Sequence, residues 1–178
     1  MSEPDRTRHS TFHNYVLGEH EETLALETSD ANREVLLAML AHGSRSVDII
    51  CRDLDRVILN HLDVYDALVG VIKRGSGARV RCLVRDAGPA TQRGHFVVNF
   101  ARRFSSFCEI RQLSETHRQF NDAFTVVDGI GVIFRGHAAR YEAHASFSDR
   151  KRARDLTRLF ETMWETATVE SNLRAFII

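Results

Sequence analysis

Strand-like and helix-like hydrophobic patterns alternate along most of this chain, and that alternation limits the folds it can adopt. Short apolar runs typical of strands lie at 23–28, 46–51, 79–84 and 107–113. Between them, at 31–40, 62–72 and 96–104, apolar residues recur every three to four positions, as on the buried face of a helix. The pattern predicts an α/β domain with a mostly parallel sheet that is covered by helices on both faces.

The C-terminal half departs from strict alternation. Two strand-like runs, 123–128 and 131–135, are joined at Asp128-Gly129, a pair typical of a tight hairpin turn. A long amphipathic helix is expected over 149–166, and the apolar tail 175–178 is expected to dock on the sheet. The full expectation is a mixed, mostly parallel sheet flanked by helices, with a β-hairpin and a long final helix.

Length and polarity indicate one domain with an N-terminal arm. The first 20 residues are polar and charged, so residues 1–20 are expected to form a flexible arm and residues 21–178 one α/β domain. The longest apolar run, Val35–Ala41, is too short to cross a bilayer, and no secretory signal is visible. These features favour a cytoplasmic protein.

The charges balance, but the basic residues are unusual. Lys+Arg and Asp+Glu each number 24, and only Lys73 and Lys151 are lysines, which leaves 22 arginines. The codon usage of a GC-rich genome explains such a bias, whereas a functional explanation is bidentate contact with phosphate or carboxylate. Zero net charge argues against a dedicated non-specific DNA-binding protein.

Three cysteines, Cys51, Cys82 and Cys108, fall one in each of three predicted strands. This placement favours buried thiols that pack as small hydrophobic groups. The alternative, a three-cysteine metal site, fits poorly because structural zinc normally has four ligands. Neither a metal nor a cofactor is expected.

Two Arg-Asp sequences follow predicted strands directly. Arg52-Asp53-Leu54-Asp55 follows one strand, and Arg85-Asp86 follows the next. Ligands of open parallel sheets bind outside the carboxyl ends of the strands, where both pairs would lie. The alternative is that these residues only cap helices or pair locally. No phosphate-binding loop, dinucleotide fingerprint or nucleophile elbow is present.

The order of elements resembles one half of a phospholipase D-like protein, over residues 23–166. The motif of that superfamily is His-x-Lys-x4-Asp on the strand that enters an Asp-Gly-type turn. The matching stretch here is 121–128, where Asn121 replaces the His, Ala123 replaces the Lys, and Asp128 matches the Asp. The His of the motif attacks phosphorus, and Asn121 can neither attack nor titrate. The resemblance therefore implies a domain that has lost the usual phosphodiesterase chemistry.

Further stretches are similar to a proteobacterial group of uncharacterised phospholipase D-like domains that lack the motif. They are Cys51–Asp55, Gly94–Phe96, Ala101–Ser105, Glu109–Arg111, Val132–Arg135 and Leu159–Glu165. Members of that group are sometimes described as acyltransferases. The resemblance implies no established activity.

The predicted lining of a ligand cleft combines these features. It consists of Arg52, Asp53, Asp55, Arg85, Asp86, His95, Asn121 and Arg135. His95 stands at the start of a predicted helix, where the helix dipole lowers an imidazole pKa, although a structural bond to backbone is the alternative. His117, His137 and His144 in predicted loops are further substitutes for the missing nucleophile, but their spacing does not support that role.

Three hypotheses for the function follow. The leading one is a non-catalytic phospholipase D-like domain that binds a phosphate-bearing ligand or a protein partner. The second is an enzyme with rewired phosphodiesterase or acyl-transfer chemistry that uses His95 or a hairpin histidine. The third is a nucleic-acid-binding module.

Two further expectations concern partners. Single halves of the superfamily pair with a second copy, so a homodimer with the Asn121 strands near its twofold axis is expected. Arg150, Arg154 and Arg158 recur on one helical face, which suggests an acidic partner or only a solvated face.

Overall fold

Eight strands form a single sheet at the centre of the molecule. The computed structural model describes residues 11–169. In chain order the strands are β1 (Leu24–Leu26), β2 (Ser46–Cys51), β3 (Arg79–Val84), β4 (Cys108–Gln112), β5 (Ala123–Val127), β6 (Gly131–Arg135), β7 (Ala143–Ser146) and β8 (Thr168–Val169). Across the sheet they lie in the order β1-β7-β6-β5-β2-β3-β4-β8.

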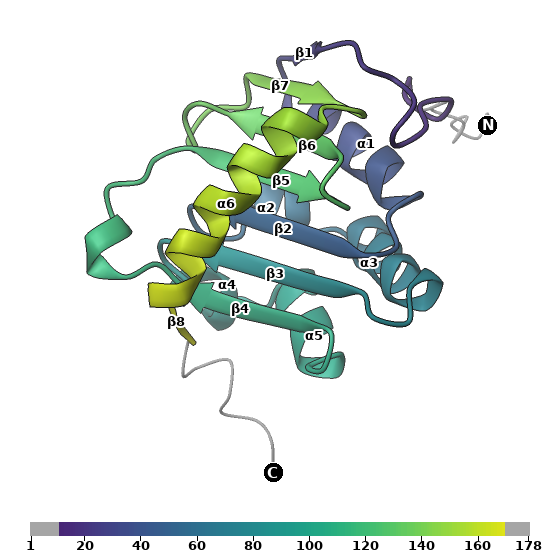
Figure 1. Ribbon diagram of the computed structural model, residues 1–178. Coiled ribbons are helices and arrows are strands. Elements are labelled where there is room, and N and C mark those ends of the chain that lie inside the picture. The colour runs from purple at the N-terminus through teal and green to yellow at the C-terminus, as the bar shows by residue number, and fades with distance from the viewer. Residues whose placement is uncertain (1–10, 170–178) are drawn as a thin grey trace, which may run out of the picture.

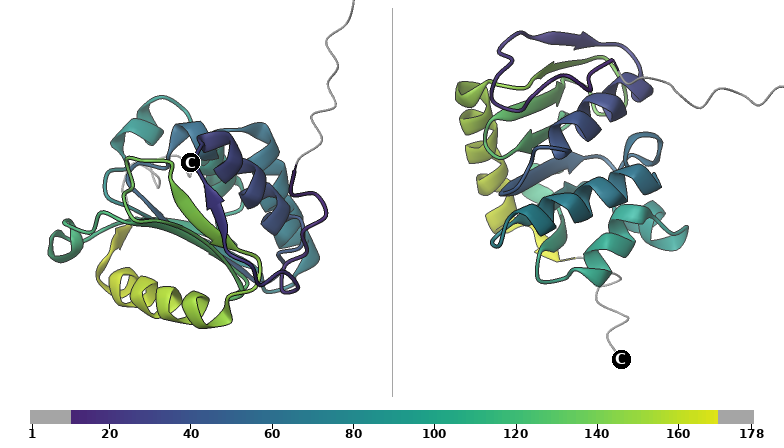
Figure 2. Two further views of the ribbon diagram at one scale, coloured as in Figure 1. Left: turned by 90° about the horizontal axis from the view of Figure 1, so that it is seen from above. Right: turned by 90° about the vertical axis from the view of Figure 1, so that its right-hand side faces the viewer.

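Helices cover both faces of the sheet, but unequally. They are α1 (Ser29–Leu40), α2 (Arg56–Leu59), α3 (Leu62–Arg74), α4 (Gly88–Gln92), α5 (Phe96–Arg103) and α6 (Arg150–Thr166), with a short 3-10 turn η1 (Glu115–His117). Helix α6 lies alone across the front face, and the other helices lie behind the sheet (Figure 1). The view from above shows the two layers on opposite sides of the sheet (Figure 2). None of the helices within residues 11–169 has the length and apolarity that a membrane crossing requires.

The α/β class, the hairpin and the long final helix are confirmed, but the expectation of a mostly parallel sheet is wrong. Strands β2, β3 and β4 pair in parallel, as alternation with helices requires. The other five pairings within the described chain are antiparallel. The physical reason is the connection after β4. It contains only the η1 turn and no crossover helix, so β5 returns antiparallel along the far side of β2.

The Asp128-Gly129 turn joins β5 to β6 and also fixes the end of β2. Asp128 has a φ of 55° and Gly129 a φ of 67°, the left-handed conformation that a tight hairpin turn needs. The Asp128 carboxylate accepts hydrogen bonds from the backbone N–H groups of Ser44, Arg45 and Ser46, at 3.0, 2.8 and 2.9 Å. This carboxylate therefore ties the hairpin turn to the start of β2.

The sequence predicted a flexible arm over residues 1–20 and a docked apolar tail over 175–178. Within the expected arm, residues 11–20 contact the domain: the Tyr15 ring lies 5.1 Å from that of Phe147, and Gly18 N–H donates to the Phe147 carbonyl at 2.8 Å. Residues 1–10 and the apolar tail 175–178 lie outside the described residues. The flexibility of the arm and the docking of the tail stay predictions.

All three cysteines are buried free thiols in the sheet. Burial raises the pKa of the Cys51 thiol, so the thiol stays protonated at neutral pH. No group of three metal-binding side chains occurs within residues 11–169. The cysteines thus act as packing residues in the sheet.

A charge cluster, buried at Arg81 and Asp48 and half-exposed at Glu161, joins the sheet to α6. Arg81 on β3 donates to Asp48 on β2 at 2.8 Å and to both carboxylate oxygens of Glu161 on α6 at 2.8 and 3.0 Å. Its guanidinium also stacks over the rings of Phe160 and Trp164, at 4.8 and 5.3 Å from their centroids. The bond from Arg81 lowers the pKa of Glu161. Because every group of the cluster has a partner, the charges can remain inside.

Replacing Arg81 by Met should lower the free energy of unfolding by about 3–5 kcal/mol, because Asp48 would then be buried without its counter-charge. Arg79 is a matched control on the same strand. Its side chain is 58% exposed, and its guanidinium comes no closer to Glu161 than 3.9 Å, which makes a weak ion pair. Arg79→Met should cost less than about 1 kcal/mol. Urea denaturation measures both, and equal losses would contradict the structural role of Arg81.

Candidate functional site

The two Arg-Asp sequences meet at the carboxyl ends of β2 and β3. Arg85 N–H donates to the carbonyl of Arg52 at 3.0 Å, and Asp86 N–H donates to the same carbonyl at 2.9 Å. The parallel register, in which Cys51 lies opposite Val84, brings the two turns to the same height. The structure therefore places Arg52 and Arg85 side by side, although they are far apart in sequence.

Strand β5 brings the stretch 121–128, which the sequence analysis compared with the motif, to the same place. Its antiparallel register, with Phe124 opposite Ile50, delivers the residues before β5 to the carboxyl end of β2. Asn121 is exposed there, and its carbonyl accepts from Ala138 N–H at 2.8 Å. A small pocket of about 10 Å³ lies between these segments. It is lined by Ile50, Cys51, Arg52, Arg85, Leu113, Phe120, Asn121, Asp122 and Ala138.

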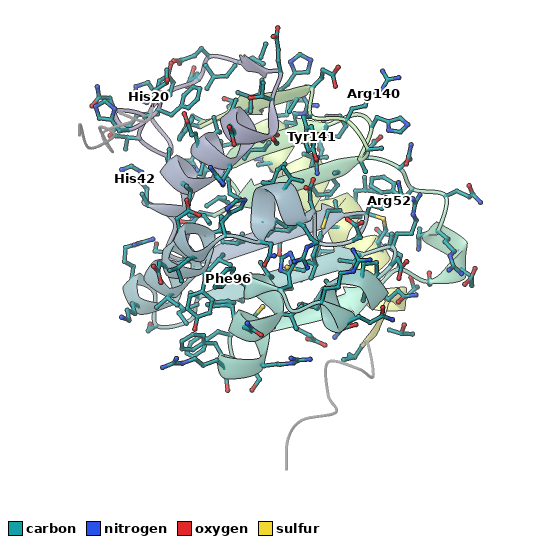
Figure 3. The ribbon with its side chains drawn as sticks, turned by 180° about the vertical axis from the view of Figure 1, so that it is seen from behind. His20, His42, Arg52, Phe96, Arg140 and Tyr141 are labelled. Atoms are coloured by element: carbon teal, nitrogen blue, oxygen red, sulfur yellow. The ribbon has the colours of Figure 1, made fainter. Side chains whose placement is uncertain are left out.

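A larger hollow of about 290 Å³ adjoins this pocket and shares Arg52 and Ala138 with it. Its lining is Arg52, Asp53, Asp55, Arg56, Val57, Ala138, Ala139 and Tyr141. Seen from behind, Arg52 and Tyr141 both lie in the upper right part of the molecule (Figure 3). We call the small pocket and this hollow together the strand-end groove. Its volume is close to the lower end of the range of small-molecule sites.

Arg52 and Arg85 are the free cations of the groove. Neither guanidinium has a hydrogen bond or ion pair within residues 11–169. Arg56, by contrast, donates to the Gly94 carbonyl at 2.9 Å. Two neighbouring guanidinium groups without counter-charges form an arrangement that favours an anion.

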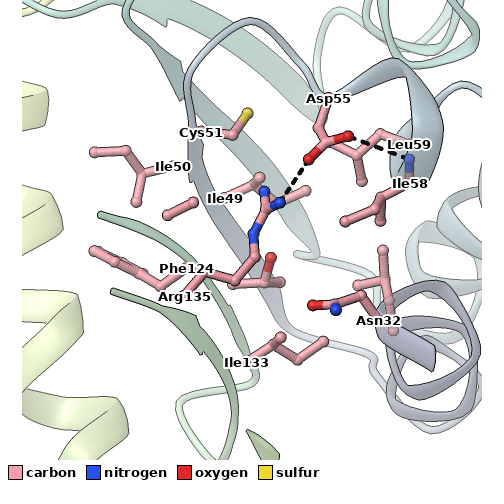
Figure 4. Close-up of a pocket in the computed structure, with 13 residues that line it drawn as sticks. Asn32, Ile49, Ile50, Cys51, Asp55, Ile58, Leu59, Phe124, Ile133 and Arg135 are labelled. Carbon is pink, nitrogen blue, oxygen red and sulfur yellow. Dashed lines mark hydrogen bonds and ion pairs between the residues drawn. The ribbon is translucent and has the colours of Figure 1, made fainter. Parts of the chain in front are cut away.

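Arg135 lies beside Ala123, on the neighbouring strand β6. It lies opposite Ala123 in the β5–β6 register, and its side chain is only 8% exposed. Its guanidinium pairs with the Asp55 carboxylate at 2.7 Å (Figure 4). The cavity around this pair measures about 30 Å³, enough for a water molecule but too small for a phosphate group. Arg135 and Asp55 therefore neutralise each other within the protein.

His95 supports the backbone of the groove from below. It is 2% exposed, its Nδ1 accepts from Val97 N–H at 3.1 Å, and its Nε2 donates to the Leu54 carbonyl at 2.9 Å. Leu54 and Asp55 have positive φ values of 65° and 27°, a conformation that costs energy in residues with a side chain. The neutral imidazole thus holds a strained turn that places Asp55 against Arg135.

The other expected residues lie away from the groove lining. The Asp86 carboxylate accepts from Gly88 N–H at 3.0 Å, which matches the alternative of a local cap. Asp128 lies at the opposite end of β5 from Asn121. None of His117, His137 and His144 lines the two parts of the groove.

Several groove residues were missed by the sequence reasoning. They are Arg56, Val57 and Tyr141. These residues belong to no recognisable sequence motif, and they come to the groove only because the turn after β2 and the loop between β6 and β7 fold towards each other. Burial and the Asp55 carboxylate raise the pKa of the Tyr141 phenol. Val57, which is 50% exposed, follows Arg56 in a four-residue helix too short to show a period in sequence.

The pH dependence of stability should report the role of His95. Burial lowers the pKa of His95 from 6.5 to about 4. The unfolded chain therefore binds the proton at a higher pH than the native protein, so the contribution of His95 is complete above pH 6.5 and declines as the pH falls towards 4. The difference in unfolding free energy between the wild type and His95→Gln should shrink over that window. Urea denaturation at several pH values tests this, and a constant difference would contradict it.

The fold is similar to that of phospholipase D family structures. Nuc from Salmonella typhimurium, a phospholipase D family member, matches with a TM-score of 0.60 at 15% identity, over 84% of this chain and 97% of that chain. NucT from Helicobacter pylori matches with a TM-score of 0.57 at 12% identity, over 84% and 99%. The chain therefore has the phospholipase D-like fold that the order of elements predicted.

TrmBL2, described as an archaeal chromatin protein, matches with a TM-score of 0.63 at 15% identity, over 84% of this chain. The match spans 54% of TrmBL2, about half of its length. No curated protein matches the sequence. A family model described as "Domain of unknown function (DUF7931)" matches residues 28–176. Because that match covers most of the sequence, the chain belongs to the DUF7931 family.

Proposed function

We propose that this domain is a non-catalytic phospholipase D-like module that binds a phosphate-bearing ligand in the strand-end groove. The observation that carries the proposal is the pair of guanidinium groups, Arg52 and Arg85, which lie beside Asn121 and have no partner among residues 11–169. Arginine binds phosphate oxygens through two parallel N–H bonds, and two such groups can share one phosphate. The Asn121 amide adds a neutral donor at the same point.

The same residues argue against phosphodiesterase chemistry. Covalent catalysis of that kind needs a nucleophile at the position of Asn121 and a cation at that of Ala123. An amide and a methyl group supply neither. Arg135 brings a cation close to Ala123, but Asp55 already neutralises it at 2.7 Å. Binding can therefore persist in this groove where the reaction of the superfamily cannot.

The shape of the groove indicates how a ligand would lie. The small pocket is too narrow for a phosphate, so the phosphate would rest at its mouth between Arg52 and Arg85. The remainder of the ligand would extend into the larger hollow along Val57 and Tyr141. The Asp53 carboxylate in that hollow favours hydroxyl or amino groups on this part of the ligand.

A binding experiment tests the proposal with phenyl phosphate and inorganic phosphate as probes. Phenyl phosphate should raise the thermal midpoint of the wild type, and Arg52→Ala/Arg85→Ala should weaken its affinity at least about tenfold. Arg93→Ala/Arg103→Ala is the matched control, because both side chains are exposed outside the groove lining. Equal binding by both double variants would overturn the proposal.

Rewired enzyme chemistry is the main competing function. The geometry of His95 does not favour it, because both ring nitrogens already bond to backbone. Turnover of bis-p-nitrophenyl phosphate that is lost in Asn121→Ala, or an esterase or thioesterase activity lost in His95→Ala, would replace the binding proposal with an enzyme. A nucleic-acid-binding module is the third candidate, and the description of TrmBL2 reports DNA binding for that protein.

Self-association through the groove edge is part of the same proposal. A C2 dimer with the Asn121 strands near the axis would bring the arginines of the two copies together, and bound phosphate groups or an acid such as Asp53 would offset their repulsion. Light scattering at micromolar concentrations should then give about twice the monomer mass of 20.3 kDa. A mass of 20.3 kDa across that range would contradict the dimer.

A further inference from the structure

The outer face of α6 concentrates positive charge in a chain whose net charge is zero. Residues 150–158 contain five cations and one carboxylate, so this segment carries a net charge of +4 and the remaining residues carry −4. Four of the cations, Arg150, Lys151, Arg154 and Arg158, are exposed. Because the charges are segregated so strongly, zero net charge does not describe this surface.

These four cations have no counter-charge within the described chain. None of them forms an ion pair, a side-chain hydrogen bond or a cation–π contact within residues 11–169. Asp155 lies on the same segment and is exposed, but it forms no ion pair with these cations within residues 11–169. Two other carboxylates close in sequence are engaged elsewhere. Asp149 caps the helix by accepting from Arg152 N–H at 2.9 Å, and Glu161 is bound by Arg81.

The arrangement opposes the preferences of an isolated helix. Cations in the first turn face the positive end of the helix dipole, and like charges at i, i+4 repel each other. Packing against the sheet stabilises α6 enough to offset this electrostatic repulsion. The buried residues of the helix are Ala153, Leu156, Phe160, Met163 and Trp164. The outer face is therefore cationic for a reason other than helix stability.

We propose that Arg150, Lys151, Arg154 and Arg158, here called the α6 basic face, bind the sugar-phosphate backbone of a nucleic acid. Eight residues separate the first and last of them, which is about 12 Å along the helix. Four cations over this length can neutralise up to three or four phosphates of one strand. Arginine forks suit that ligand chemistry better than the point charge of lysine.

Other partners fit this face less well. A membrane-surface helix inserts its apolar side, but the apolar side of α6 is buried against the sheet. A protein interface has an apolar or aromatic centre, whereas the only large apolar side chain exposed on α6 is Leu159, at 38%. A row of cations without such an anchor is typical of contact with a phosphate backbone, which is independent of base sequence.

The face is limited in length. Glu161 and Glu165 continue the same side of α6 beyond Arg158, and Glu165 is exposed. Their carboxylates would repel a phosphate chain that extended further along the helix. The contact should therefore be short, weak and strongly dependent on salt.

Fluorescence anisotropy with a labelled 20-nucleotide single strand of mixed sequence tests the proposal. Three to four phosphate contacts predict a slope of log affinity against log salt of about −2 to −3, which is a loss of about 20- to 50-fold between 50 and 200 mM salt. Arg154→Gln/Arg158→Gln should make that slope shallower by about 1.4. An oligonucleotide of different sequence should bind with the same affinity.

Matched variants separate this face from other sites. Arg93→Gln/Arg103→Gln removes the same charge from the opposite side of the sheet and should leave the slope unchanged. Arg52→Ala/Arg85→Ala should also leave it unchanged, which keeps this proposal separable from the groove proposal. Circular dichroism melts confirm that every variant is folded.

Three results would overturn the proposal. They are an absence of binding at 50 mM salt, binding that is insensitive to salt, and equal effects of the Arg154/Arg158 and Arg93/Arg103 variants. Binding to phosphatidylserine vesicles but not to the oligonucleotide, with the same dependence on Arg154 and Arg158, would assign the face to a lipid surface instead.

Discussion

The Asp128 carboxylate fixes the register on which the rest of the sheet depends. By accepting three backbone N–H groups at the start of β2, it locks the β5–β6 turn against one end of the central strands. Since a strand cannot slip by one residue without turning its side chains to the other face, this anchor determines what arrives at the far end of β5. There it places Asn121 beside Arg52 and Arg85, and Ala123 opposite Arg135. A contact at one end of the sheet thus sets the geometry of a site at the other.

Within the stretch 121–128, the residue that matches the motif in sequence, Asp128, is also the one with a clear role in the fold. Asp128 serves the fold, and replacing it would leave three amide groups without their acceptor. At the other end of β5, Asn121 is exposed and Ala123 packs as a small core residue. Arg135 then fills the space opposite Ala123, paired internally with Asp55. The groove cations that have no partner in the described part of the chain, Arg52 and Arg85, consequently lie further out, at the rim of the strand-end groove.

Local hydrophobic patterns predicted most helices and strands well. They could not predict which strands pair with each other or which distant residues come into contact. Strands β2 and β3 are six-residue segments rich in Val, Ile, Leu and Cys, and their observed bounds equal the predicted ones. Strand β7, Ala-His-Ala-Ser, has too little hydrophobic pattern to be recognised, and the antiparallel return of β5 depends on a connection without a helix. Arg135 and Asp55 were both predicted to line a cleft. Their mutual neutralisation depends on the turn at Leu54 and Asp55, which His95 holds in place. His95 is 40 residues from Asp55 along the chain, so no rule based on residue spacing could predict this contact.

The abundance of arginine shows a similar limit, because composition gives the number of arginines and only the structure gives their partners. Codon usage can place 22 arginines in a chain, but it does not choose their partners. In the structure the arginines differ in their surroundings. Arg81 is enclosed by two carboxylates and two aromatic rings, and it joins the sheet to α6. Arg52 and Arg85 stand without counter-charges within residues 11–169, at a point where three strands converge. Arg154 and its neighbours form a row on a helix that would be more stable without them. A bias of purely genomic origin would scatter unpaired cations over the surface, whereas unpaired cations that converge on a groove or align along a helix match the geometry of an anionic ligand.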